Sequence, residues 1–395
     1  MAVVPSRDLT ELMQALLGPL NKKPPPPPQP AMGFFTDTSL CIGCKACEVA
    51  CKQWNQLPAK EPVWTGSSYD NTGELSAITW RHVQFIDRPV LKAPVWHWEI
   101  IWYFFFGGLA AGCYIIATIA SLFGSREDRA VVCTGYYLSL LALLPCPPLL
   151  IKDLGRPERF LNMLRMFKVK SPMSMGTWSL VTFSLSSSTT ALIQAARDGL
   201  LGRWWGARFL VALPQKLIAL PGAAAGFFLG SYTGVLLTAT SVPLWSRSKL
   251  LGGIFLTSAL STSSALISFV LRLTNAPRSA LHKLERLEWA ALLIEMTGIL
   301  AFLRGTGRAS RTLVGTAPSE HGMTFWRFVC GSGLALPWLL QTLSLIKRSP
   351  QRRASSGLFI SLLVLVGGYF LRRTMIEAGH TSSADARTTL WNAKR

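Results

Sequence analysis

The sequence predicts a mostly α-helical protein, a polytopic membrane bundle of eight transmembrane helices that follows a small cysteine-bearing segment. Half of the 395 residues are hydrophobic and only 15% are charged, whereas a soluble domain carries about 25% charged residues. After Trp98 the apolar residues form successive runs, each near the ~20 residues that cross a bilayer. Four of the eight cysteines lie together before these runs, so the chain joins a small soluble segment to a membrane domain.

The charge of the chain is strongly basic, with 40 Lys and Arg against 20 Asp and Glu, a net +20. Such an excess is common in proteins that bind nucleic acid, but a mean hydropathy of +0.32 and 14 Trp argue against that class. Basic loops between apolar runs are typical of multi-pass membrane proteins. We therefore expect lipid headgroups, and no nucleic acid, to face the basic residues, in the inner membrane of a cell.

The first part of the chain divides into two segments. Residues 1–32 contain apolar residues at helical spacing, followed by the proline run Pro24–Pro28, which predicts an amphipathic helix and a stiff linker. Residues 33–95 have the composition of a small soluble segment. Within it, the stretch Ala77–Ile86 alternates between apolar and polar residues, which predicts a strand.

The membrane domain is expected to cover residues 96–380, with a polar tail at 381–395. Prolines near the end of the second span, among them Pro145, predict a kinked or broken helix. Gly222, Gly226, Gly230 and Gly234 recur every four residues in the fourth span. This ladder permits close helix packing, either within the bundle or between two copies. The eight predicted spans are 99–123, 130–151, 177–196, 217–240, 250–271, 284–303, 325–346 and 357–371.

The cysteine cluster has the spacing C-x2-C-x2-C-x3-C, formed by Cys41, Cys44, Cys47 and Cys51. Thiolates at this spacing bend the chain around a 4Fe-4S cluster in bacterial ferredoxins, and Gly43 lets the backbone approach. A zinc site more often uses two separated cysteine pairs. The spacing therefore favours a ferredoxin-like iron–sulfur segment.

Completion of this site is a separate question. In two-cluster ferredoxins the fourth cysteine of a run ligates the other cluster, and that arrangement needs a second run. The other four cysteines lie singly in apolar segments. Three alternatives follow: one cluster held by this run alone, ligands supplied by a partner, or a degenerate site.

The cysteine segment resembles the beta, iron–sulfur subunit of formate dehydrogenases. The resemblance rests on FFTDTSLCIGCKACEVACKQWNQLP (34–58) and SSYDNTGELSAITWRHVQF (67–85). It implies a partnership with a catalytic subunit of the molybdopterin type and with further iron–sulfur subunits. That family continues with three more cysteine runs, which this chain lacks.

The membrane domain resembles the NrfD/PsrC family, the membrane subunits of polysulfide reductase-like complexes. The matching pieces are WHWEIIWYFFFGGLAAG (96–112), KDLGRPERFLNML (152–164), SPMSMGTW (171–178), SYTGVLLTATSVPLW (231–245) and FLRRTMIEAG (370–379). The resemblance implies a quinone, either menaquinone or ubiquinone, bound beside a cluster-bearing subunit, and no haem. It also implies an outward-facing iron–sulfur segment. The residues themselves do not decide the orientation, since the loops on the two sides of the membrane contain nearly equal numbers of Lys and Arg.

Three residues are candidates for the quinone region. The resemblance places Tyr103 and Tyr232 at positions that contact quinone, although tyrosines in spans are often interfacial belt residues. Asp153 is the carboxylate best placed at the mouth of the second span. Its alternative role is an ion pair with Arg156 or Arg159.

Two carboxylates are candidates for a proton path. Glu288 and Glu295 lie seven residues apart on the sixth span, hence on nearly one face of a helix. Carboxylates within a membrane are energetically costly and usually functional, with a structural hydrogen bond as the alternative. Arg372 and Arg373, after the last predicted span, are expected to contact lipid headgroups.

The histidines bear on haem. A b-type haem in a helical bundle needs axial ligands within the membrane, and none of the five histidines falls in the middle of a predicted span. We therefore expect a non-catalytic redox subunit that passes electrons between an iron–sulfur cluster and quinone for a catalytic partner. The alternative is a membrane anchor whose cluster site has degenerated; a proton or ion transporter without redox work is weaker.

Overall fold

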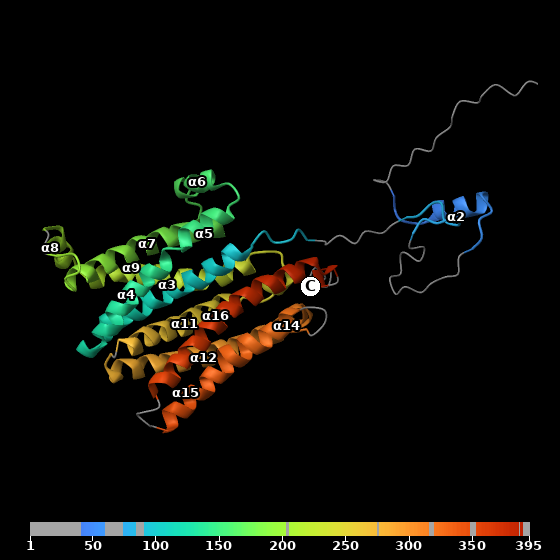
Figure 1. Cartoon of the computed structure of the whole chain (residues 1–395). Coiled ribbons are helices and arrows are strands. Elements are labelled where there is room, and N and C mark those ends of the chain that lie inside the picture. Colours follow the sequence, from blue (N-terminus) through green and yellow to red (C-terminus); the bar gives the residue numbers. More distant parts are fainter. Residues whose placement is uncertain are drawn as a thin grey trace, which may run out of the picture. The chain divides into compact units, whose positions relative to one another are not determined.

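The computed structural model describes residues 41–59, 74–83, 91–202, 205–274, 276–315, 320–347, 353–386 and 388–389. The predicted amphipathic helix and proline linker lie outside these residues. The chain divides into two compact units, Met1–Asp87 and Arg88–Arg395, which are described separately (Figure 1).

The first unit contains helix α2, Ala46–Trp54, directly after the first two cysteines. The predicted strand at Ala77–Ile86 is wrong for the residues that the structure describes. Ser76 and Thr79 form only an isolated bridge, and the Trp80 indole donates to the carbonyl of Ala77 at 2.8 Å. These contacts close a tight turn, which uses locally the backbone groups that a strand would offer to a neighbour.

The second unit is a helical bundle, and its long helices run side by side (Figure 1). Its helices and helical turns are α3 (Trp98–Phe123), η2 (Arg126–Asp128), α4 (Arg129–Leu143), α5 (Cys146–Asp153), η3 (Pro157–Arg159), α6 (Phe160–Arg165), α7 (Pro172–Arg197), α8 (Trp205–Ala212), α9 (Gln215–Thr238), α10 (Pro243–Ser246), α11 (Leu251–Leu273), α12 (Arg278–Thr306), η4 (Gly307–Ser310), α13 (Arg311–Val314), α14 (Glu320–Thr324), η5 (Phe325–Ala335), α15 (Leu336–Lys347) and α16 (Arg353–Ala384).

Five helical stretches of the described chain are long and apolar enough to cross a membrane. They are α3, the stretch Arg126–Asp153 that includes α4 and α5, α9, α11 and most of α16. Five of the eight predicted spans are thus confirmed as apolar helices. The other three fall on α7, on α12 and on η5 with α15, which are more polar or shorter, so an eight-span topology stays a prediction.

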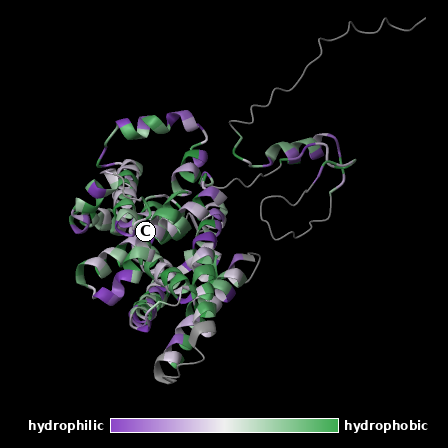
Figure 2. Ribbon diagram, turned by 60° about the vertical axis from the view of Figure 1, so that its left-hand side comes forward, coloured by the Kyte–Doolittle hydropathy of each residue, from purple (hydrophilic) through white to green (hydrophobic). Residues whose placement is uncertain are grey.

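Helix α3 is the centre of the bundle, with contacts to α4, α9, α11 and α16. Its sequence is apolar on all sides, and most of its residues are buried, as expected for a helix surrounded by others. Hydrophobic residues cover much of the bundle, and hydrophilic ones gather near helix ends (Figure 2). This distribution fits helices that cross a hydrocarbon layer.

Proline and glycine shape two of these helices as the sequence predicts. The second span breaks at Pro145, which separates α4 from α5. On α9, a methyl group at Gly222 would collide with Tyr114, and one at Gly234 with the backbone of Leu251. The glycine ladder therefore packs within the bundle, against α3 and α11.

Candidate functional site

The four clustered cysteines lie on a loop and on the helix that follows it. Cys41 and Cys44 are exposed, whereas Cys47 and Cys51 are partly buried on α2. The backbone adopts positive φ at Gly43 (71°) and Lys45 (58°), a conformation that favours glycine. These two residues turn the chain sharply between the cysteines.

The thiols accept hydrogen bonds of the kind found around iron–sulfur clusters, but within the described residues they are not gathered around one point. The Gly43 amide donates to the sulfur of Cys41 at 3.4 Å, and the Asn55 side chain donates to the sulfur of Cys51 at 3.6 Å. Hydrogen bonds to the sulfurs tune iron–sulfur clusters. However, no three His, Cys, Asp or Glu side chains of the described residues are grouped so that they could hold a metal ion. The donor set fits a cluster, and the convergence of its thiols stays a prediction.

Tyr103 and Tyr232 approach each other inside the second unit. Both side chains are buried, and Tyr103 lies within electrostatic range of Tyr232 and of Cys146 on α5. The Tyr232 hydroxyl donates to the carbonyl of Pro172 at 2.7 Å. Its ring fills the space that a side chain at Gly176 would occupy, so the start of α7 holds this tyrosine in place.

Asp153 ends α5 and lies within electrostatic range of Glu99 and His97. In the described part of the chain its carboxylate forms no ion pair with Arg156 or Arg159, the alternative that the sequence raised. The neighbouring Lys152 instead pairs with Glu99 at 3.4 Å. The three candidate residues thus lie in one region of the bundle. This region is formed by the beginnings of α3 and α7, the end of α5 and the second half of α9.

Glu295 belongs to a polar chain that crosses the bundle. Its carboxylate accepts from the Ser261 hydroxyl at 2.9 Å, and the Ser258 side chain lies close to it. Ser258 in turn accepts from the guanidinium of Arg372 at 3.1 Å. The carboxylate of α12 is therefore connected through α11 to a cation on α16.

Arg372 corrects the expectation that it contacts lipid headgroups. Helix α16 continues past the predicted end of the span to Ala384, and the Arg372 side chain is only 1% exposed. Its guanidinium also donates to the carbonyls of Phe104, at 3.1 Å, and Gly368, at 2.6 Å. Gly108 of α3 leaves room for it. Arg373 faces outward and pairs with Glu377 at 2.8 Å.

Glu288 is also buried, about two helical turns before Glu295 on α12. One of its carboxylate oxygens has no hydrogen-bond partner in the described structure, and neither has the side-chain oxygen of Gln341, which lies beside it. A buried carboxylate oxygen without a partner is energetically costly. The Glu288 carboxylate can therefore bind a proton or accept a hydrogen bond from a water molecule. The Glu295 carboxylate already accepts a hydrogen bond from a serine.

These features define a multi-pass membrane protein with a buried polar network. The family described as Polysulphide reductase, NrfD matches residues 88–384, and the chain belongs to this family. Protein NrfD of Escherichia coli (strain K12) is 26% identical over 324 residues, which cover 74% of this chain and 97% of that protein. The Protein NrfD homolog of Haemophilus influenzae is 23% identical over 329 residues, 76% of this chain and 99% of that protein.

The N-terminal region matches proteins of a different kind. The iron-sulfur subunit of the nitrate-inducible formate dehydrogenase of Escherichia coli (strain K12) is 47% identical over 49 residues. The match covers 12% of this chain and 16% of that protein. Formate dehydrogenase 2 subunit beta of Nitratidesulfovibrio vulgaris is 36% identical over 72 residues, 18% of this chain and 30% of that protein. Both resemblances seen in the sequence are confirmed. The match to the formate dehydrogenase iron–sulfur subunits spans less than a third of the length of those relatives.

Proposed function

We propose that this protein is a membrane redox subunit that passes electrons between an iron–sulfur cluster and the quinone pool. The observation that carries the proposal is the fusion, in one chain, of an NrfD family domain at 88–384 with a cysteine segment similar to iron–sulfur subunits of formate dehydrogenases. A catalytic partner, of the molybdopterin type by that similarity, would supply or receive the electrons. The chain itself would carry out no substrate chemistry beyond the quinone half-reaction.

The cluster would be held by Cys41, Cys44, Cys47 and Cys51. A 4Fe-4S cluster supplies one-electron transfer at a potential set by its surroundings. The amide of Gly43 and the side chain of Asn55 would contribute the hydrogen bonds that tune it. The proposal includes an eight-helix topology in the inner membrane, with this segment facing outward.

The quinone would bind near Tyr103, Tyr232 and Asp153. The Tyr103 side chain is buried in the bundle, and its hydroxyl would donate a hydrogen bond to a quinone oxygen. The Tyr232 hydroxyl proton is engaged by Pro172, which leaves the Tyr232 oxygen as an acceptor. The Asp153 carboxylate can exchange a proton near the end of α5.

Protons would travel through the carboxylates of α12. Quinone reduction takes up one proton for each electron, and a proton needs hydrogen-bonding groups in sequence. Glu295, Ser258 and Ser261 form such a sequence within the bundle. Glu288, with its unpartnered oxygen, continues it along α12.

A second candidate function is a membrane anchor that tethers the catalytic partner without a working cluster. The observation that favours it is the single cysteine run: the other four cysteines lie singly on α3, α4, α5 and η5. In that case the family domain would be retained for assembly rather than for electron transfer.

Iron analysis distinguishes the two candidates. The full chain would be purified anaerobically, assayed for iron and acid-labile sulfide, and examined by EPR after reduction. The redox proposal expects about four irons per chain and a reducible signal, both lost in Cys47→Ser and kept in Cys330→Ser. A folded protein without iron would refute the redox proposal in favour of the anchor.

Quinone turnover tests the membrane site. Tyr103→Phe removes this hydroxyl, and the complex with its catalytic partner should reduce quinone more slowly. Tyr369→Phe is the matched control, because its ring packs against Trp102 on another face of α3. Equal rates for the two variants would remove Tyr103 from the site.

A further inference from the structure

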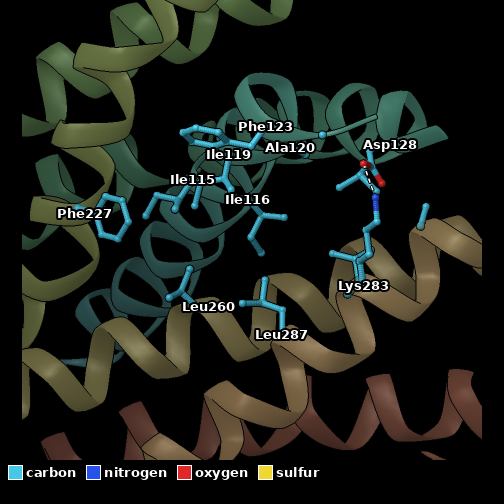
Figure 3. A pocket seen from close by; sticks show the side chains of 14 residues that line it. Ile115, Ile116, Ile119, Ala120, Phe123, Asp128, Phe227, Leu260, Lys283 and Leu287 are labelled. Atoms are coloured by element: carbon cyan, nitrogen blue, oxygen red, sulfur yellow. Dashed lines mark hydrogen bonds and ion pairs between the residues drawn. The ribbon is translucent and has the colours of Figure 1, made fainter. Parts of the chain in front are cut away.

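A groove runs along the second half of α3, away from Tyr103 at the beginning of that helix. Its volume is about 430 Å³, within the roughly 300–1,000 Å³ typical of small-molecule sites. Side chains from α3, α9, α11 and α12 surround it (Figure 3). Most of the lining is apolar, including Ile115, Ile119, Phe123, Phe227, Leu260 and Leu287.

Charged groups gather at one end of the groove. Lys283 pairs with the carboxylate of Asp128 at 2.7 Å (Figure 3), and Asp128 also accepts from the backbone amide and hydroxyl of Ser125. The Lys283 side chain is 58% exposed, whereas that of Asp128 is 5% exposed. Since an ammonium group has three donors, Lys283 can bind a further acceptor without leaving Asp128.

The charge around this end is positive. Arg278 and Arg286 are exposed on the first turns of α12, close in sequence to Lys283. The nearby carboxylate of Glu285 already accepts from Arg272 at 2.8 Å. The carboxylates of Asp128 and Glu285 are thus engaged. The exposed cations Arg126, Arg278, Lys283 and Arg286 outnumber the one further exposed carboxylate nearby, Glu127, so this end of the groove would attract an anion such as a phosphate group.

We propose that this groove binds an anionic phospholipid, with one acyl chain along α3 and the phosphate at Lys283. The apolar lining suits a hydrocarbon chain. A free phosphate ion at Lys283 would leave the apolar part of the groove unfilled. α3 and α11 are both long and apolar enough to cross a membrane, and the exposed side chains of Ile119 and Phe123 place the groove on the lipid-facing surface. The charged end lies beside the end of α3 and the beginning of α12, where headgroups meet a membrane protein.

Lipid titration of the purified full chain in detergent, followed by native mass spectrometry, tests the head site. Phosphatidylglycerol should bind more tightly than phosphatidylcholine with the same chains. Lys283→Gln combined with Asp128→Asn, which leaves no buried charge alone, should weaken phosphatidylglycerol binding about fivefold. Lys216→Gln, an exposed cation at the beginning of α9, is the control and should leave the affinity unchanged.

A second variant tests the chain site. Ile119→Trp would fill the groove and should abolish the preference for phosphatidylglycerol. Ile294→Trp is a similarly exposed isoleucine outside the groove and should keep it. Equal affinity for the two lipids, displacement of the lipid by inorganic phosphate, or equal behaviour of the two tryptophan variants would overturn the proposal.

Discussion

Arg372→Gln removes a buried guanidinium that connects α16 to both α3 and α11. In the native bundle this cation donates to the carbonyls of Phe104 and Gly368 and to the Ser258 hydroxyl. Through Ser258 it also faces the carboxylate of Glu295. The variant therefore breaks a buried network and leaves a carboxylate without its cation.

The size of the effect follows from burial. Arg372 is 1% exposed and Glu295 is 2% exposed. Removal of one partner from a directly bonded buried charge pair costs about 3–5 kcal/mol, and this range is an upper bound here because Ser258 lies between the two charges. Glutamine can retain one hydrogen bond, which is worth about 1 kcal/mol, so the lower half of that range is expected. Arg373→Gln is the matched control: its pair with Glu377 is partly exposed and should contribute at most about 1 kcal/mol.

The assay is unfolding of the detergent-solubilised protein, with stability compared among variants at one lipid and detergent composition. Arg372→Gln should be much less stable than Arg373→Gln. The double variant Arg372→Gln with Glu295→Gln should recover part of the loss, because it removes both charges. Equal stability of the two single variants would refute the buried network.

Three further predictions concern separate parts of the chain. Glu295→Gln should slow proton uptake during quinone reduction by the complex, and an unchanged rate would exclude Glu295 from the proton path. Gly234→Ala should destabilise the bundle by about 1–3 kcal/mol, because its methyl group would collide with the backbone of α11; Gly253→Ala, which faces open space, should be neutral in the same unfolding assay. Burial alone would raise the pKa of Asp198, but hydrogen bonds from Tyr137, Gln194 and Arg129 outweigh it and hold that pKa below its ordinary value of 3.8. The stability that Asp198 contributes is thus present above pH 3.8 and is lost as the pH falls through the lowered pKa. Below pH 3.8 the thermal unfolding temperature of Asp198→Asn should therefore fall less with decreasing pH than that of the native chain.

Hydropathy located the apolar helices well because a helix in hydrocarbon must satisfy its backbone internally, and its side chains must be apolar. It did not locate the end of α16. The predicted range 357–371 is shorter than the ~20 residues that a span requires, which is a signal that the helix continues through Arg372. A single sequence could not show that hydrogen-bond acceptors on α3 and α11 lie beside this cation inside the protein.

The candidate site was predictable to a similar extent. The positions of Tyr103 and Tyr232 came from family motifs, and the structure brings their side chains within electrostatic range of each other. Ser258 and Ser261 were missed, because they belong to the stretch TSALSTSS (257–264), and small hydroxyl residues in a membrane helix resemble packing residues. Their role depends on which helix lies opposite, and that is set by tertiary packing rather than by local pattern.

The buried Arg372 has a consequence for biogenesis. An arginine at the centre of a single helix costs roughly 2.5–3.5 kcal/mol to insert through the translocon. Its acceptors on α3 and α11 are synthesised long before α16 leaves the ribosome. Earlier helices that already lie in the membrane would therefore assist insertion of the last helix, and a chain that lacks α3 should insert α16 less efficiently than the native chain does.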